Sequence, residues 1–144
     1  MSDKDFLLTP IKQTETDAFK LAIAMQRRAS QAGFDWPDSV GVLDKIHEEL
    51  EELGQEIKQQ SDKSHLRAEL GDILFACCNL ARHLEIDPEE ALNSSNDKFY
   101  RRFNYVETAV TAQGKQFADF AKSKERLGFV IIAINALRTN GYLL

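Results

Sequence analysis

The sequence is poor in residues that interrupt or cross-link a chain. Its 144 residues include three prolines, seven glycines and two cysteines. The cysteines, Cys77 and Cys78, are adjacent on an expected helix, where neighbouring side chains diverge, so we expect no disulfide between them. A disulfide-stapled fold is therefore not indicated, and the pair is typical of reduced core residues in a cytoplasmic protein.

Long apolar runs and positive charge are also lacking. There is no run of about 18 apolar residues, as a membrane-spanning helix requires, and the N-terminus lacks the basic and apolar segments of a signal peptide. A net charge of −5 argues against general nucleic-acid binding. We therefore expect no membrane or nucleic-acid partner, and an acidic protein that handles a polyanion would need metal ions.

The composition, 43% hydrophobic and 28% charged, is typical of a helix-rich globular protein of one domain. Helical periodicity and capping signals predict helices over residues 14–32, 39–60 and 87–113, and one beginning after a cap at Ser61 or Asp62 and ending near residue 85. Residues 1–13 are expected to be a loose lead-in, and the apolar run 127–134 a helix. The predicted fold class is all-α, a four-helix bundle.

Two acidic pairs, Glu49-x-x-Glu52 and Glu69-x-x-Asp72, lie in adjacent predicted helices. Each pair is flanked by an apolar stripe with steps of three and four, and each lies to the same side of its stripe. The stripes comprise Leu43, Ile46, Leu50, Leu53 and Ile57, then Leu66, Leu70, Ile73, Cys77, Leu80 and Leu84. The short connection makes the helices antiparallel neighbours, so the four carboxylates can converge.

Converging carboxylates repel one another, and a hard divalent cation is the simplest relief. Oxygen-only ligands favour Mg²⁺, or Mn²⁺, over zinc. The alternative is a solvated acidic helix face. His47, His65 and His83 share no spacing with the acidic pairs and are expected at the surface or at helix ends.

Several other side chains are candidates for substrate contact. Trp36 either fills a core position or stacks on a nucleobase. Lys45 either contacts phosphate or forms an i,i+4 ion pair with Glu49. Polar side chains on the helix over residues 87–113 form either a solvated face or a phosphate clamp: Asn96, Lys98, Arg101 and Arg102.

These residues together resemble the MazG family of nucleoside triphosphate pyrophosphohydrolases, in the all-α superfamily of such enzymes, and particularly the C-terminal domain of the two-domain bacterial enzyme. The resemblance covers residues 15–114. It rests on Gly33-Phe34-Asp35-Trp36, Glu48-Glu49-x-x-Glu52, Glu69-x-x-Asp72, the run 79–84, and Asn96-x-Lys98-Phe99-x-x-Arg102-Phe103. The chain departs from the family pattern after Gly114, so we interpret 1–144 as a single domain with a core over 15–114 and a divergent extension over 115–144.

The resemblance implies an oligomeric bundle, a homodimer or homotetramer, with magnesium bound by Glu49, Glu52, Glu69 and Asp72. It implies hydrolysis of a (deoxy)nucleoside triphosphate to the monophosphate and pyrophosphate, with Glu48 assisting and with substrate contacts from Trp36, Lys45, Asn96, Lys98 and Arg102. Either Glu48 or Glu52 could accept the proton of the attacking water.

Two other functions remain open at this point. One is a catalytically weak nucleotide-binding or helical interaction module, which would keep the fold and bind a metal–nucleotide complex. The other is a purely structural bundle, whose stability would not depend on magnesium.

Overall fold

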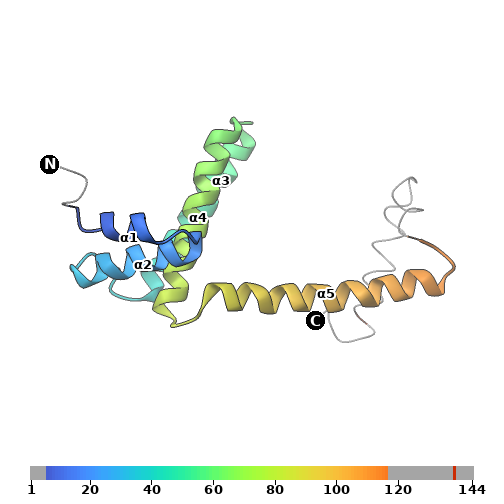
Figure 1. The fold of residues 1–144 in the computed structure, drawn as a ribbon. Coiled ribbons are helices and arrows are strands. Elements are labelled where there is room, and N and C mark those ends of the chain that lie inside the picture. Colours follow the sequence, from blue (N-terminus) through green and yellow to red (C-terminus); the bar gives the residue numbers. More distant parts are fainter. Residues whose placement is uncertain (1–5, 117–137, 139–144) are drawn as a thin grey trace. The chain divides into compact units, whose positions relative to one another are not determined.

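The computed structural model describes residues 6–116 and Arg138, and in this part of the chain it contains five α-helices and no strand (Figure 1). The all-α prediction is therefore confirmed. The helices are α1 (Thr9–Thr14), α2 (Ala18–Gln31), α3 (Ser39–Lys58), α4 (Lys63–His83) and α5 (Pro88–Ala112). None of these described helices is long and apolar enough to cross a membrane.

The chain divides into two units, Met1–Ala91 and Leu92–Leu144. The first unit contains α1 to α4 and the first turn of α5, and the rest of α5 belongs to the second unit. Their positions relative to one another are not determined, so each unit is described by itself. The apolar run 127–134, predicted as a helix, lies outside the described residues, and the single-domain interpretation stays a prediction.

An aspartate precedes each of the four longer helices, and its side chain accepts hydrogen bonds from backbone N–H groups of the first turn. Asp17 caps α2, Asp38 caps α3, Asp62 caps α4, and Asp87 caps α5. Such caps satisfy N–H groups that have no partner inside the helix. The predicted cap at Asp87 is confirmed, and of the two candidates before α4 the structure uses Asp62.

The N-terminal segment differs from its prediction as a loose lead-in. Thr9–Thr14 forms the short helix α1, and α2 begins at Ala18 rather than near Thr14. Pro10 is compatible with the first turn of a helix because its missing N–H would have no intrahelical partner there. Glu15 then adopts an extended conformation and separates the two helices.

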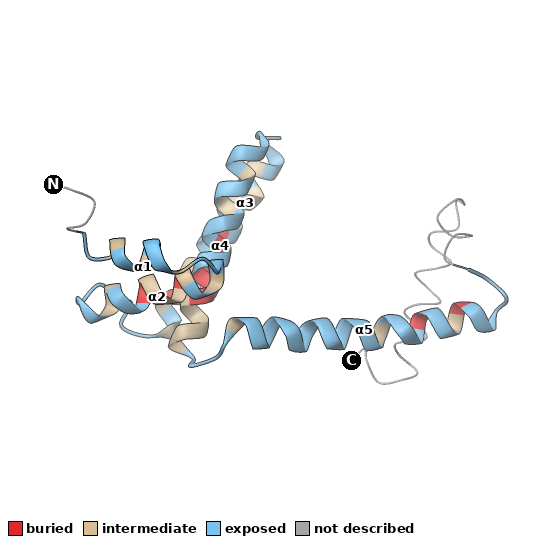
Figure 2. Cartoon of the chain, viewed as in Figure 1, coloured by how far each residue is buried: buried red, intermediate tan, exposed pale blue. Residues whose placement is uncertain are grey.

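The core of the first unit lies where α2, α3 and α4 meet. The residues Gln59 to Asp62 connect α3 to α4, and the two helices pack along each other as antiparallel neighbours (Figure 1). Helix α2 packs on α4, and α1 packs on α2. Figure 2 shows buried positions on these helices. They are Ala22, Gln26, Val42, Ile46, Glu49, Ile73, Ala76 and Cys78.

The buried line of α3 is rotated from the predicted apolar stripe. Ile46 is buried as expected, but Val42 and Glu49 are its buried neighbours, whereas Leu43, Leu50 and Ile57 are 44%, 49% and 59% exposed. The same change affects α4, where Leu70 and Cys77 are exposed and Cys78 is buried. Helix α3 packs against α4 through the side that carries Glu49, so part of its leucine stripe remains on the surface.

In the second unit, α5 is mostly exposed along its first half, and its buried residues are Val106 and Val110 (Figure 2). Phe99 and Phe103, one turn apart, stack with ring centroids 6.0 Å apart. The helix ends before Gly114, as predicted, and this glycine adopts a positive φ of 68°.

Candidate functional site

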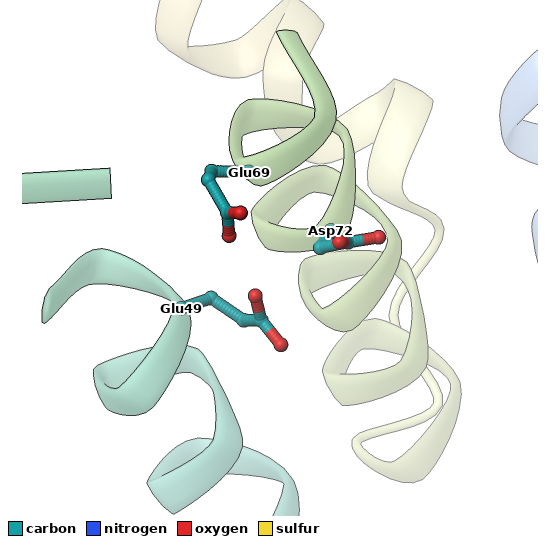
Figure 3. Close-up of side chains that lie close together, drawn as sticks. All are labelled: Glu49, Glu69 and Asp72. Carbon is teal, nitrogen blue, oxygen red and sulfur yellow. The ribbon is translucent and has the colours of Figure 1, made fainter. Parts of the chain in front are cut away.

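Three carboxylates from two helices form one group in the first unit. Glu49 of α3 faces α4, which contributes Glu69 and Asp72 (Figure 3). One oxygen from each side chain lies within 4.8 Å of the other two. Glu49 is buried, Glu69 is half-buried and Asp72 is exposed, so the group opens from the helix interface to solvent. We call it the acidic group.

The packing of α3 against α4 explains this convergence. Glu49 lies one turn beyond the buried Ile46, so its side chain points into the helix interface. Glu69 and Asp72 are three residues apart and therefore neighbours on α4. The acidic pairs were predicted to meet through this antiparallel pairing, and three of the four carboxylates do so.

Glu52, the fourth predicted ligand, is exposed and lies outside the group of mutually close oxygens. Burial raises the pKa of Glu69, and the negative charge of Glu52, followed by those of Glu49, Asp72 and Glu56, raises it further. Glu52 is therefore within electrostatic range of Glu69. Its role as a ligand stays a prediction.

Glu48, like Glu52 a predicted proton acceptor, is exposed and hydrogen-bonded to Lys45. The Nζ atom of Lys45 lies 3.0 Å from Glu48 Oε1 and 2.7 Å from Glu49 Oε1. The i,i+4 ion pair considered for Lys45 is therefore present. Hydrogen bonds from the ammonium group to Glu49 and Glu48 raise the pKa of Lys45 well above its ordinary value. The lysine thus neutralises one edge of the acidic group.

The donor set fits a hard divalent cation. Its atoms are carboxylate oxygens alone, which suit Mg²⁺ or Mn²⁺. Burial, followed by the nearby negative charges, raises the pKa of Glu69, so its ionised form is disfavoured there. Lys45 pairs with Glu49, and among the described residues no ion pair offsets the charges of Glu69 and Asp72.

A cavity of about 380 Å³ begins at the acidic group. It is lined by Glu49, Asp72, Lys45 and Trp36, among others. A second cavity of about 600 Å³ has a mainly apolar wall that includes Met25, Ala29, Phe34 and Phe75. The two cavities share four lining residues: Gln26, Trp36, Phe75 and Asn79. A charged subsite and an apolar subsite therefore adjoin within the first unit.

Trp36 is 45% exposed and lines both cavities, so it is not a fully buried core residue. Gln26 also lines both. Its side-chain N–H group donates to the carbonyl oxygen of Phe75 at 2.9 Å, and its Oε1 is buried without a hydrogen-bond partner. The helical pattern gave no reason to distinguish Gln26, because a glutamine in an amphipathic helix is normally on its polar face.

A polar cluster that the sequence did not predict lies beside the second cavity. Asp35 Oδ1 accepts hydrogen bonds from the Trp36 N–H and from Arg82 Nη2, and lies 3.1 Å from His83 Nε2. Asn79 Oδ1 accepts from Arg82 Nε and Nη2 at 3.0 and 2.8 Å. Asp35 and Arg82 are 47 positions apart in sequence. Both residues belong to the family motifs of the sequence, which marked them as candidates. Their spacing in the sequence could not show that they form a pair.

The remaining predicted substrate contacts lie on the part of α5 that belongs to the second unit. Asn96 and Lys98 are exposed, and Arg102 is half-buried. The placement of this unit relative to the acidic group is not determined, so these three assignments stay predictions.

The first unit is thus an all-helical protein segment in which two antiparallel helices gather carboxylates suited to a divalent cation. Residues 38–107, which include the acidic group, match the MazG nucleotide pyrophosphohydrolase domain. Through this segment the chain belongs to the MazG family, as its sequence motifs predicted.

Curated relatives support this assignment. The chain is 44% identical over 97 residues to the nucleoside triphosphate pyrophosphohydrolase/pyrophosphatase MazG of Thermotoga maritima, covering 67% of this chain and 36% of that protein. It is 45% identical over 98 residues to the nucleoside triphosphate pyrophosphohydrolase of Escherichia coli K12, covering 67% of this chain and 37% of that protein. A shorter match, 53% over 57 residues, covers 40% of this chain and 12% of the uncharacterized protein YabN of Bacillus subtilis. The chain therefore spans little more than a third of the length of the first two relatives.

Proposed function

We propose that this chain hydrolyses (deoxy)nucleoside triphosphates to the monophosphate and pyrophosphate with magnesium, and that manganese can replace magnesium. The observation that carries the proposal is the convergence of Glu49, Glu69 and Asp72 inside the segment that matches the MazG domain. The names of the curated relatives support the same reaction. We further propose a role in maintaining the cytoplasmic nucleotide pool.

In this proposal Glu49, Glu69 and Asp72 hold the metal, with Glu52 as a fourth ligand from the adjacent turn. A bound magnesium ion supplies charge neutralisation for the phosphoryl oxygens and acidifies a bound water. Lys45 shifts between its ion pair with Glu49 and contact with a phosphate oxygen. Asn96, Lys98 and Arg102 are proposed as further phosphate contacts.

The reaction forms a bond between a water oxygen and the α-phosphorus and breaks the bond from that phosphorus to the α,β-bridging oxygen. Pyrophosphate leaves, and a carboxylate accepts the proton of the water. Glu48 and Glu52 are the two candidates for this acceptor, because both are exposed beside the acidic group. The arrangement does not require a covalent enzyme intermediate.

The adjoining cavities support a binding mode for the nucleotide. Its triphosphate occupies the cavity that contains Glu49 and Asp72, and its base and sugar occupy the apolar cavity of about 600 Å³. Trp36, which lines both cavities, lies where a base can stack on its indole.

Product analysis with a panel of ribo- and deoxyribonucleoside triphosphates tests the proposal. With magnesium we expect equal amounts of monophosphate and pyrophosphate, separated by anion-exchange chromatography, and none with a chelator present. Diphosphate plus phosphate would mean attack at the γ-phosphorus. The absence of product, with magnesium and nucleotide still raising the midpoint of thermal unfolding, would instead favour a nucleotide-binding module.

A further inference from the structure

The indole of Trp36 lies against the first turn of α3 at a point where α3 has no side chain. A Cβ atom placed on Gly41 would be 2.9 Å from Cε3 of Trp36 and 3.5 Å from Cζ3. Contacts below 3.0 Å between carbon atoms force a displacement, and a fused ring system moves only as a rigid body. The present position of the indole therefore depends on glycine at position 41.

The backbone of the same tryptophan is held by Asp35. Oδ1 of Asp35 accepts the Trp36 N–H at 2.9 Å and, through Arg82 and His83, joins the loop that carries Trp36 to the end of α4. Arg82 is itself oriented on α4 by two hydrogen bonds to Asn79. The side chains of Arg82 and His83 are only 13% and 12% exposed and that of Asp35 is 26% exposed, so this network is partly shielded from solvent.

The charge state of Asp35 is consistent with this role. Burial raises the pKa of Asp35, but hydrogen bonds from Arg82, His83 and the Trp36 N–H outweigh burial and leave the pKa below its ordinary value of 3.8. Asp35 is therefore ionised at neutral pH and makes charge-assisted hydrogen bonds, which are stronger than neutral ones.

We propose that Asp35 and Gly41 are positioning residues that fix Trp36 as the wall between the metal-side cavity and the apolar cavity, and thereby set the affinity for the nucleoside part of the substrate. The inference rests on the proposed function for its substrate. The contacts that support the inference are made by α3, α4 and the loop before α3. Neither residue is placed at the reacting phosphorus, so both act on binding rather than on the hydrolytic step.

Trp36 is the single tryptophan of the chain, so its emission reports its own surroundings. Gly41→Ala removes the space beneath the indole, and Gly54→Ala is a matched control in the same helix, because a Cβ atom at Gly54 meets no atom within 4 Å. Both changes place alanine in a helix, where alanine is favoured over glycine, so both variants should fold. We expect Gly41→Ala to shift the emission maximum and increase quenching by acrylamide, and Gly54→Ala to do neither.

Steady-state kinetics then separates binding from catalysis. For Gly41→Ala and Asp35→Ala we expect KM to rise by about tenfold with kcat unchanged, because the first change displaces the indole and the second removes the charge-assisted contact that holds its backbone. Asp35→Asn should recover part of the loss, because its side-chain oxygen can still accept the Trp36 N–H. Asp44→Asn, an exposed charge removal on α3, serves as the control.

The two proposals fail in different ways. If the wild type forms no monophosphate, the proposed reaction is wrong, and the positioning role is judged by titrating each ribonucleoside monophosphate against Trp36 emission in the wild type and Gly41→Ala. A lower affinity in Gly41→Ala would support the role. Unchanged emission in Gly41→Ala, an unchanged KM or nucleotide affinity, or a fall in kcat at constant KM would overturn it, whether or not the chain is an enzyme.

Discussion

Glu49 and Asp72 are the side chains on which the proposed activity depends most. Because both are placed to hold the metal, Glu49→Gln and Asp72→Asn should each lower magnesium-dependent turnover by at least about 100-fold, the scale of a lost metal-ion contribution. Circular dichroism should show unchanged helicity, since each substitution leaves the volume of the side chain nearly unchanged. Glu51→Gln, an exposed change on the same helix, is the control. Full activity in both site variants would contradict the assignment.

Glu69 should link the stability of the metal-free protein to pH. Its pKa is raised in the folded state from an ordinary value of 4.5, so the ionised carboxylate disfavours folding. The penalty is complete above the folded-state pKa and disappears as the pH falls below the ordinary value. Glu69→Gln should therefore raise the unfolding midpoint at pH 7 without metal, and have little effect in acid.

Magnesium should give the opposite result for the same variant. Added magnesium should raise the midpoint of the wild type more than that of Glu69→Gln, because the variant keeps the other proposed ligands but lacks one carboxylate. Differential scanning calorimetry measures both effects. A metal-free Glu69→Gln variant less stable than the wild type at pH 7 would mean that the carboxylate makes a favourable contact instead.

At the level of single residues, the sequence predicted which carboxylates could come together but not which of them do so in the folded protein. Periodicity identified Glu49, Glu69 and Asp72 because antiparallel pairing follows from a short connection. It also placed Glu52 in the same group, because a three-residue step does not reveal how far a helix is rotated. The cluster of Asp35 and Arg82 was beyond prediction, since it depends on the folded path of a loop.

The helix ends contain two residues in a conformation that favours glycine. Gln60 and Glu85 follow α3 and α4 with φ values of 55° and 56°. A left-handed conformation costs a residue with a Cβ about 1 kcal/mol or more. Gln60→Gly should therefore increase the free energy of unfolding by up to about 1 kcal/mol. Urea denaturation followed by circular dichroism measures the change.

The neighbouring glutamine provides the control for this prediction. Gln59 has φ −78° and lies in the right-handed helical region. Gln59→Gly should lower the free energy of unfolding by about 0.5 to 1 kcal/mol, because glycine loses more backbone freedom on folding. Equal effects of the two changes would contradict the conformational explanation.

The ends of a helix were predictable where the sequence contains a residue that caps a helix, such as aspartate before it or glycine after it. Asp62 and Asp87 precede α4 and α5 as expected, and Gly33 and Gly114 end α2 and α5 with positive φ. Helix α1 was missed, because a six-residue helix presents too few apolar positions to establish a period. The rotation of α3 was also missed, because its leucine stripe satisfies helical periodicity whether it faces the core or a partner.

For the whole molecule, the exposed stripe of α3 supports the predicted homodimer or homotetramer. Leu43, Leu50 and Ile57 are spaced by seven residues, so they share one side of the helix, and each is 44–59% exposed. We predict that sedimentation equilibrium gives a mass of at least twice 16.3 kDa. Leu50→Lys should lower that mass, whereas Gln55→Lys, at an exposed position about 140° around the helix from Leu50, should not. A monomeric wild type at micromolar concentration would contradict the prediction.

The central claim is that the acidic group directs water to the α-phosphorus of a nucleoside triphosphate. Hydrolysis in ¹⁸O-labelled water, with mass spectrometry of both products, tests it most directly. Attack at the α-phosphorus places the label in the monophosphate and leaves the pyrophosphate unlabelled, which is the predicted result. Label in pyrophosphate or in free phosphate would place the attack at another phosphorus and contradict the claim.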